Sequence, residues 1–123
     1  MIVDISSPVP VGKKIINGYK DGSFIVDTRE YCSSIVISSE NVIEFNELNI
    51  NYLKHYELFL TKDIEYVLVG TGKIRIKPCV SVKHYLMQYK NIKFEFMSTD
   101  SACRTYNILL LEDRLVIAYL VVI

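Results

Sequence analysis

The stretch of residues 97–107 combines a thiol, a guanidinium group, hydroxyls, a phenol and a side-chain amide. Its sequence is Met-Ser-Thr-Asp-Ser-Ala-Cys-Arg-Thr-Tyr-Asn. Ser98 and Thr99 are residue types that often cap the start of a helix, and Asp100 would then lie in the first turn. A carboxylate is favourable there, because the N-terminal end of a helix carries partial positive charge. We therefore predict that a helix begins here and presents this chemistry.

Cys103 would lie within the first turns of that helix and beside Arg104. A helix N-terminus and a nearby cation both lower the pKa of a thiol, so a reactive thiolate is one interpretation. A buried thiol is the alternative that we favour, because Cys103 belongs to an apolar stripe at helical spacing. The stripe also contains Ala102, Tyr106, Leu109 and Leu110. We predict a buried, slowly reacting Cys103 and no catalytic residue.

A second candidate feature is Gly70-Thr71-Gly72, which follows a buried strand. In α/β proteins, ligands bind beyond the carboxyl ends of strands, and the helix that starts near Thr99 should begin at the same end of the sheet. A crevice there could hold an anion. The alternatives are a tight strand exit that requires glycine and a purely structural role for the helix residues. The candidate ligand-binding residues are Gly70, Thr71, Gly72, Thr99, Asp100, Arg104 and Asn107.

Charge is distributed unevenly along the chain. Residues 73–93 contain only basic charged residues, whereas residues 21–65 are mainly acidic. This asymmetry suits an acidic partner or an anionic membrane surface, and a solvated helix face is the alternative. The candidate partner-binding residues are Lys73, Arg75, Lys77, Lys83 and Lys90.

Length, composition and net charge limit the classes of protein to which the chain can belong. A chain of 123 residues, half of them hydrophobic, predicts a single domain with its own core. The net charge of zero disfavours a general nucleic-acid binder. Cys32, Cys79 and Cys103 form no CxxC pair, and His55 and His84 stand apart from them. We therefore predict no metal, no cofactor and no disulfide, and reduced thiols in a cytoplasmic protein.

No membrane span or signal peptide is predicted. The N-terminus lacks a basic start and a long apolar stretch, and residues 1–14 are predicted to form a loosely ordered leader. The longest apolar run, Leu115–Ile123, has nine residues, whereas a spanning helix needs about 20. Peripheral association with a membrane stays open.

The first half of the chain predicts an antiparallel meander. Asp21-Gly22 lies between two β-rich runs and is typical of a type I′ hairpin turn. Residues 27–30 predict a second turn. The predicted strands are 15–20, 23–26, 31–38 and 42–45.

The second half changes period. Apolar residues at helical spacing between Leu48 and Leu60 predict a helix, and the stripe of Val82, Tyr85, Leu86 and Tyr89 after Pro78 predicts another. Strands are predicted at 64–69, 92–97 and 114–121. Such strand–helix–strand units favour parallel pairing, so we expect these three strands in one sheet, with the first two parallel.

Three motifs, in this order, resemble the Mth938-like family, a former domain of unknown function that includes mitochondrial respiratory complex I assembly factor 3. They are a GYxDGxF-like hairpin at residues 18–24, the GTG at residues 70–72, and residues 97–107, which closely resemble the signature MDTxxACRTYN. The resemblance implies an α/β fold with a mixed central sheet, covering helices and an antiparallel β-meander layer.

Two functions follow as hypotheses. The first is a non-enzymatic binding or assembly module with a protein partner; the resemblance implies a helper in building a membrane respiratory complex. The second is a small-molecule or anion-binding enzyme that uses the crevice between Gly70–Gly72 and the helix of residues 99–107.

Overall fold

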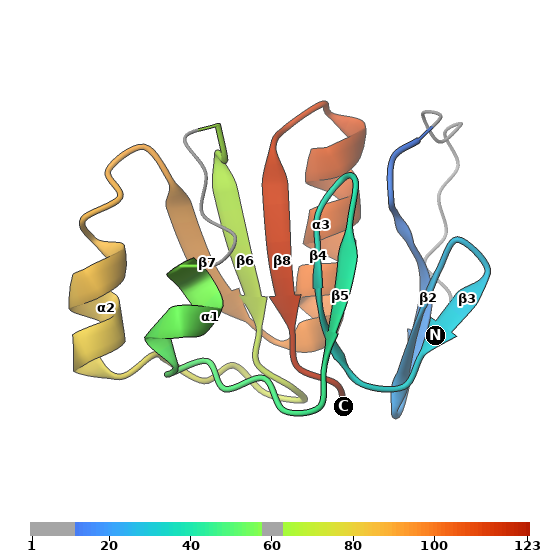
Figure 1. The fold of residues 1–123 in the computed structure, drawn as a ribbon, viewed down its shortest axis with the longest axis horizontal. Coiled ribbons are helices and arrows are strands. Elements are labelled where there is room, and N and C mark those ends of the chain that lie inside the picture. Colours follow the sequence, from blue (N-terminus) through green and yellow to red (C-terminus); the bar gives the residue numbers. More distant parts are fainter. Residues whose placement is uncertain (1–11, 58–62) are drawn as a thin grey trace.

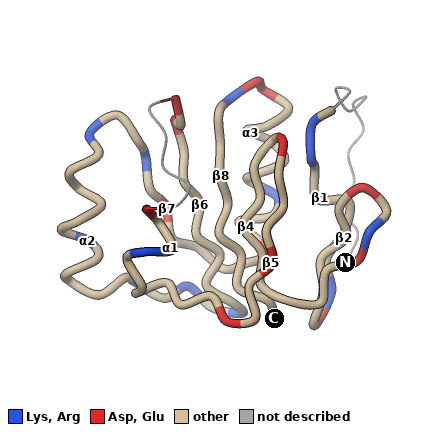
Figure 2. The backbone as a smooth tube through the Cα atoms, viewed as in Figure 1, with Lys and Arg blue, Asp and Glu red and all other residues tan. Residues whose placement is uncertain are grey.

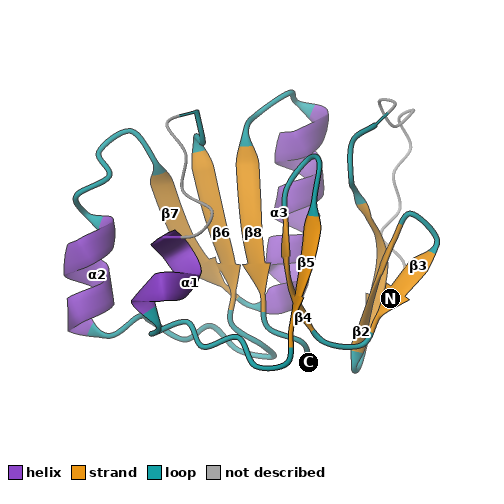
Figure 3. Cartoon of the chain, viewed as in Figure 1, coloured by secondary structure: helices purple, strands orange, loops and turns teal. Residues whose placement is uncertain are grey.

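The chain folds into two sheets and three helices. The computed structural model describes residues 12–57 and 63–123. A three-stranded sheet has the order β1-β2-β3, and a five-stranded sheet has the order β5-β4-β8-β6-β7 (Figure 1). The predicted α/β class, with a mixed central sheet and an attached antiparallel layer, is confirmed. The strands and helices are shown by type in Figure 3.

The small sheet is built from two tight turns. Strands β1 (Ile16–Lys20), β2 (Ser23–Val26) and β3 (Arg29–Tyr31) pair antiparallel. The predicted type I′ geometry belongs to the second turn, where Asp27 and Thr28 have φ of 51° and 67°; in the first turn only Gly22, at 87°, has positive φ.

One predicted strand was wrong. Residues 31–38 are divided, because β3 ends at Tyr31 and β4 (Ser34–Ile37) belongs to the other sheet, between β5 (Val42–Phe45) and β8. All four residues of β4 are buried, as expected of a strand inside a sheet that is covered on both faces. The exposed Cys32 lies in the connection.

The predicted parallel arrangement is confirmed. Strand β6 (Tyr66–Gly70) pairs parallel with both β7 (Lys93–Met97) and β8 (Val116–Leu120). Strand β4 pairs antiparallel with β8, so the sheet is mixed. This order places β7 at one edge of the sheet.

Helices cover both faces of the large sheet. Helix α3 (Thr99–Leu111) and the small sheet share one apolar cluster, which includes Phe24, Leu68 and Tyr106. Helices α1 (Leu53–Glu57) and α2 (Val80–Leu86) belong to a second cluster on the opposite face. Leu48 is buried but precedes α1, and residues 58–60 of the predicted helix lie outside the described residues.

The described part of the predicted leader is held in place. The Lys14 amide donates to the Ser39 carbonyl at 2.8 Å, and its ammonium group pairs with Asp27 at 2.8 Å. Residues 1–11 lie outside the described residues.

Candidate functional site: a basic groove between α2 and β7

The end of β6 and the start of α3 are in direct contact. The Gly72 amide donates to Thr99 Oγ1, the Thr99 amide donates to the Gly72 carbonyl, and the Thr71 amide donates to the Met97 carbonyl, each at 2.8 Å. A Cβ on Gly70 would lie 2.8 Å from the Thr99 Cα. The amides of Thr71, Gly72 and Thr99, which line the predicted crevice, are therefore used within the fold, as in a tight strand exit.

The polar residues of α3 contact the N-terminal layer. The Asn107 side chain is 2% exposed and makes two hydrogen bonds with the backbone of Ile16, at 2.9 and 2.8 Å. The Tyr106 hydroxyl donates to the Lys14 carbonyl at 2.7 Å, and Arg104 donates to the Tyr19 hydroxyl at 2.9 Å. These contacts support the structural interpretation of Arg104 and Asn107.

A small hollow of about 420 Å³ adjoins the predicted crevice. Its lining combines charges of both signs with aromatic and apolar groups: Tyr19, Lys20, Asp21, Lys73, Asp100 and Ile123. The Ser98 hydroxyl donates to Asp100 at 2.6 Å and holds the pKa of that carboxyl below its usual value. Asp100 also lies 3.9 Å from Arg104. Lys73, one of the predicted partner-binding residues, therefore faces this hollow.

Cys103 is fully buried, as predicted. Burial raises the pKa of its thiol to about 12, and the neighbouring carboxylate of Asp100 acts in the same direction. Cys32 and Cys79 are exposed, and the Ser81 hydroxyl and backbone amides at the start of α2 lower the pKa of Cys79.

Iodoacetamide is therefore expected to alkylate Cys79 of the folded protein about a hundredfold or more faster than Cys103, because the thiolate is the reacting form and Cys103 is enclosed. Peptide mapping by mass spectrometry measures both rates. Labelling in denaturant, where the thiols should react alike, is the control. Comparable rates in the folded state would contradict the burial and favour a reactive thiol.

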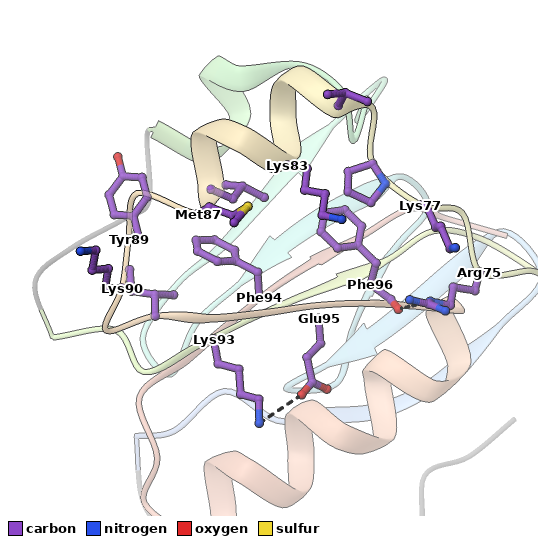
Figure 4. Close-up of a pocket in the computed structure, with 14 residues that line it drawn as sticks. Arg75, Lys77, Lys83, Met87, Tyr89, Lys90, Lys93, Phe94, Glu95 and Phe96 are labelled. Atoms are coloured by element: carbon purple, nitrogen blue, oxygen red, sulfur yellow. Dashed lines mark hydrogen bonds and ion pairs between the residues drawn. The ribbon is translucent and has the colours of Figure 1, made fainter.

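Four of the five predicted partner-binding residues line one large groove. The groove has a volume of about 940 Å³ and lies between α2, the loops at its two ends, and β7 (Figure 4). Arg75, Lys77, Lys83 and Lys90 contribute to its lining. The structure thus gathers residues that are up to 15 positions apart in the sequence.

The floor of the groove is apolar. Phe94 and Phe96 point from β7 toward α2, whereas Lys93 and Glu95 point to the other side of the strand (Figure 4). Val80 and Met87 lie at the two ends of α2 and are 73% and 67% exposed. Large apolar side chains at a strongly basic site are typical of a surface that a partner covers.

The groove is strongly positive. Five cations and one carboxylate line it, and that carboxylate, Glu95, lies 3.9 Å from the ammonium group of Lys93. The backbone from β6 to β7 carries blue positions and no red ones between residues 73 and 93 (Figure 2). Such a surface attracts acidic groups over several ångströms.

Sequence reasoning missed the apolar half of this site. Phe94 and Phe96 fall within the strand predicted at residues 92–97, and no part in binding was predicted for them; both side chains are only partly buried. Their exposure follows from the position of β7 at the sheet edge, which no local pattern encodes.

No group of three or more His, Cys, Asp or Glu residues that could hold a metal ion occurs within residues 12–57 and 63–123. Among the helices of the same residues, none is long and apolar enough to cross a membrane.

Known proteins with similar sequences and structures were found for this chain. A curated relative, the "13 kDa major membrane protein" of Francisella tularensis subsp. holarctica (strain LVS), is 31% identical over 100 residues, which cover 78% of this chain and 80% of the relative. The crystal structure of an outer membrane protein from Bartonella henselae is similar with a TM-score of 0.73 and 27% identity, covering 90% of this chain and 96% of that one.

The solution structure of a Mth938-like domain from Bordetella pertussis matches with a TM-score of 0.75 and 20% identity, covering 97% of this chain and 92% of that one; this match concerns the fold alone. The family model described as "Protein of unknown function (DUF498/DUF598)" matches residues 16–121, nearly the whole described chain. The chain therefore belongs to this DUF498/DUF598 family and has its Mth938-like fold.

Proposed function

We propose that the chain is a non-catalytic binding module that holds an acidic, partly apolar segment of a protein partner in the α2–β7 groove. The observation that carries the proposal is the lining itself, which combines five cations with the side chains of Phe94, Phe96 and Met87. An acidic segment complements the charge, and its apolar side chains would cover the exposed floor.

The relatives suggest where such a partner lies. One is named a membrane protein and another an outer membrane protein, and the described helices of this chain contain no candidate membrane span. We propose that the chain works from the cytoplasm at a membrane, by binding a protein there. The resemblance to complex I assembly factors makes the assembly of a membrane respiratory complex the process that we propose for it.

The enzyme hypothesis has less support from the described contacts. In its proposed crevice the amides of Thr71, Gly72 and Thr99 are paired within the fold, and Cys103 is enclosed. We therefore keep the binding module as the single proposed function.

Selection of peptides from a displayed random library on the purified protein tests the proposal. Bound peptides are expected to be rich in Asp and Glu combined with apolar residues. The double variant Lys83→Glu/Lys90→Glu should weaken the tightest selected peptide by about tenfold or more, because it reverses two charges at the groove. The affinity of the wild-type protein should also fall with added salt.

The double variant Lys20→Glu/Arg29→Glu is the matched control, since it makes the same change of charge on the exposed surface of the small sheet. It should leave the affinity within about twofold, because neither Lys20 nor Arg29 lines the groove. Peptides without acidic residues, or equal losses in both double variants, would contradict the proposal. Groove-dependent binding to phosphatidylserine vesicles without any selected peptide would replace the protein partner by an anionic lipid surface.

A further inference from the structure

The groove follows the outer edge of a β-strand. Its lining includes every residue from Ile92 to Phe96, both those whose side chains point toward α2 and those whose side chains point to the other side of the strand. Successive side chains of a strand point to opposite faces, and a hollow that contacts both faces must lie along the edge between them. Strand β7 is the last strand of the five-stranded sheet and has β6 as its neighbour on one side.

The backbone groups that face this edge can be assigned. The Lys93 amide donates to the Glu65 carbonyl, and the Met97 carbonyl accepts from the Thr71 amide, so these residues direct their backbone groups toward β6. The backbone groups of Phe94 and Phe96 therefore point away from β6, into the groove. Within residues 12–57 and 63–123, neither amide pairs with another backbone group.

Among the residues that the structure describes, one side chain protects this edge. Arg75 Nε donates to the Phe96 carbonyl at 2.9 Å, whereas the amide and carbonyl of Phe94 and the amide of Phe96 have no hydrogen-bond partner within the described part of the chain. At the edge of β1, by contrast, the Asn107 side chain forms hydrogen bonds with both the amide and the carbonyl of Ile16. An open edge is a template for a further strand.

The charge of the groove lining determines which kind of strand can pair with the edge of β7. A second copy of this chain would bring five further cations against the five already present, so self-pairing at this edge is electrostatically unfavourable. A segment with acidic side chains has the opposite sign. Its side chains on one face would meet Phe94, Phe96 and Lys83, and those on the other face would meet Lys93.

We propose that the partner segment binds as an extended strand added to β7, with backbone hydrogen bonds to Phe94 and Phe96 and with acidic and apolar side chains in the groove. This inference rests on the proposed function and names its mode of recognition. Strand addition gives affinity through the main chain, while the flanking side chains give specificity.

Two measurements on the tightest acidic peptide from the selection test this mode. The first is amide hydrogen exchange by NMR. Saturating peptide should slow exchange at Phe94 and Phe96 by about tenfold or more, because these amides would gain partners. The amide of Lys93, already bonded to Glu65, is the internal control and should change little.

The second measurement is a scan in which each peptide residue is N-methylated in turn. Affinity should fall by about tenfold at every second residue and by less than about twofold at the residues between, because alternate amides of a strand face the same neighbour. Similar losses at all interior residues would indicate a bound helix, because every interior amide of a helix donates within the helix, and would overturn strand addition.

The outcomes separate the inference from the proposed function. Acidic, groove-dependent peptides that leave Phe94 and Phe96 unprotected would overturn the strand and leave the binding module standing. Failure of the selection to give acidic, groove-dependent peptides would overturn both. Protection of these two amides in the concentrated protein alone, with a dimer in solution, would make the occupant a second copy and also overturn the inference.

Discussion

Replacing Gly70 by alanine is expected to lower the free energy of unfolding by about 2 kcal/mol, and replacing it by valine should cost still more. An alanine Cβ would lie 2.8 Å from the Thr99 Cα and 3.0 Å from a methyl group of Leu120. The first of these is a backbone atom at the start of α3, which cannot turn aside as a flexible side chain could. Either β6 or α3 must move, at the point where the two elements exchange hydrogen bonds.

Urea unfolding followed by circular dichroism measures the effect, and the order of the variants is its own control. Strand propensity alone would make valine the most favourable residue at this position and glycine the least favourable. The close approach to Thr99 predicts the reverse order, glycine above alanine above valine. A Gly70→Val protein as stable as the wild type would show that the contact is not a constraint.

Local sequence patterns were sufficient to predict much of the five-stranded sheet. The parallel strands β6 and β8 are buried on both faces, and such strands appear as continuous apolar runs that a sequence shows directly. The stripe of α3 predicted the burial of Cys103 for the same reason, because helical spacing fixes which side chains share a face.

The division of residues 31–38 between two sheets could not be predicted in this way. Tyr31 pairs with Phe24, and Ile35 pairs with Leu120, so the two ends of the predicted strand have partners about 96 positions apart in the chain. Both ends carry apolar, β-branched or aromatic residues, and propensity treats them alike. The choice of sheet depends on long-range pairing.

The candidate site shows the same limit. The absence of acids from residues 73–93 identified four cations that line the groove. The sequence could not show that Gly72 and Thr99 satisfy each other, nor that β7 lies at an edge where Phe94 and Phe96 stay accessible. In each case, the outcome depends on which distant segments of the chain lie next to one another in the fold.

Asn107 is where α3 joins the small sheet, and its loss is the second large effect that we expect. Its amide accepts from the Ile16 N–H and donates to the Ile16 carbonyl, both in a buried setting. Asn107→Leu keeps the size but leaves two buried backbone groups unpaired, which should lower the free energy of unfolding by about 3 kcal/mol. Asn107→Asp should also lower the free energy of unfolding at pH 7.5, because an ionised carboxylate cannot donate to the Ile16 carbonyl and would be buried.

The pH dependence of Asn107→Asp tests this account. A buried carboxyl can replace the amide only when it is protonated, so folding raises the pKa of this carboxyl. The loss in free energy of unfolding, relative to the wild type, should therefore become smaller as the pH falls from 7.5 to 4.5. Asn17→Asp is the matched control: within the described residues, the exposed Asn17 side chain accepts from the Asp27 amide at 2.9 Å, and aspartate can accept equally well. Urea midpoints of the three proteins at both pH values give the answer. A deficit of Asn107→Asp that grows toward acid pH would contradict the donor role of Asn107.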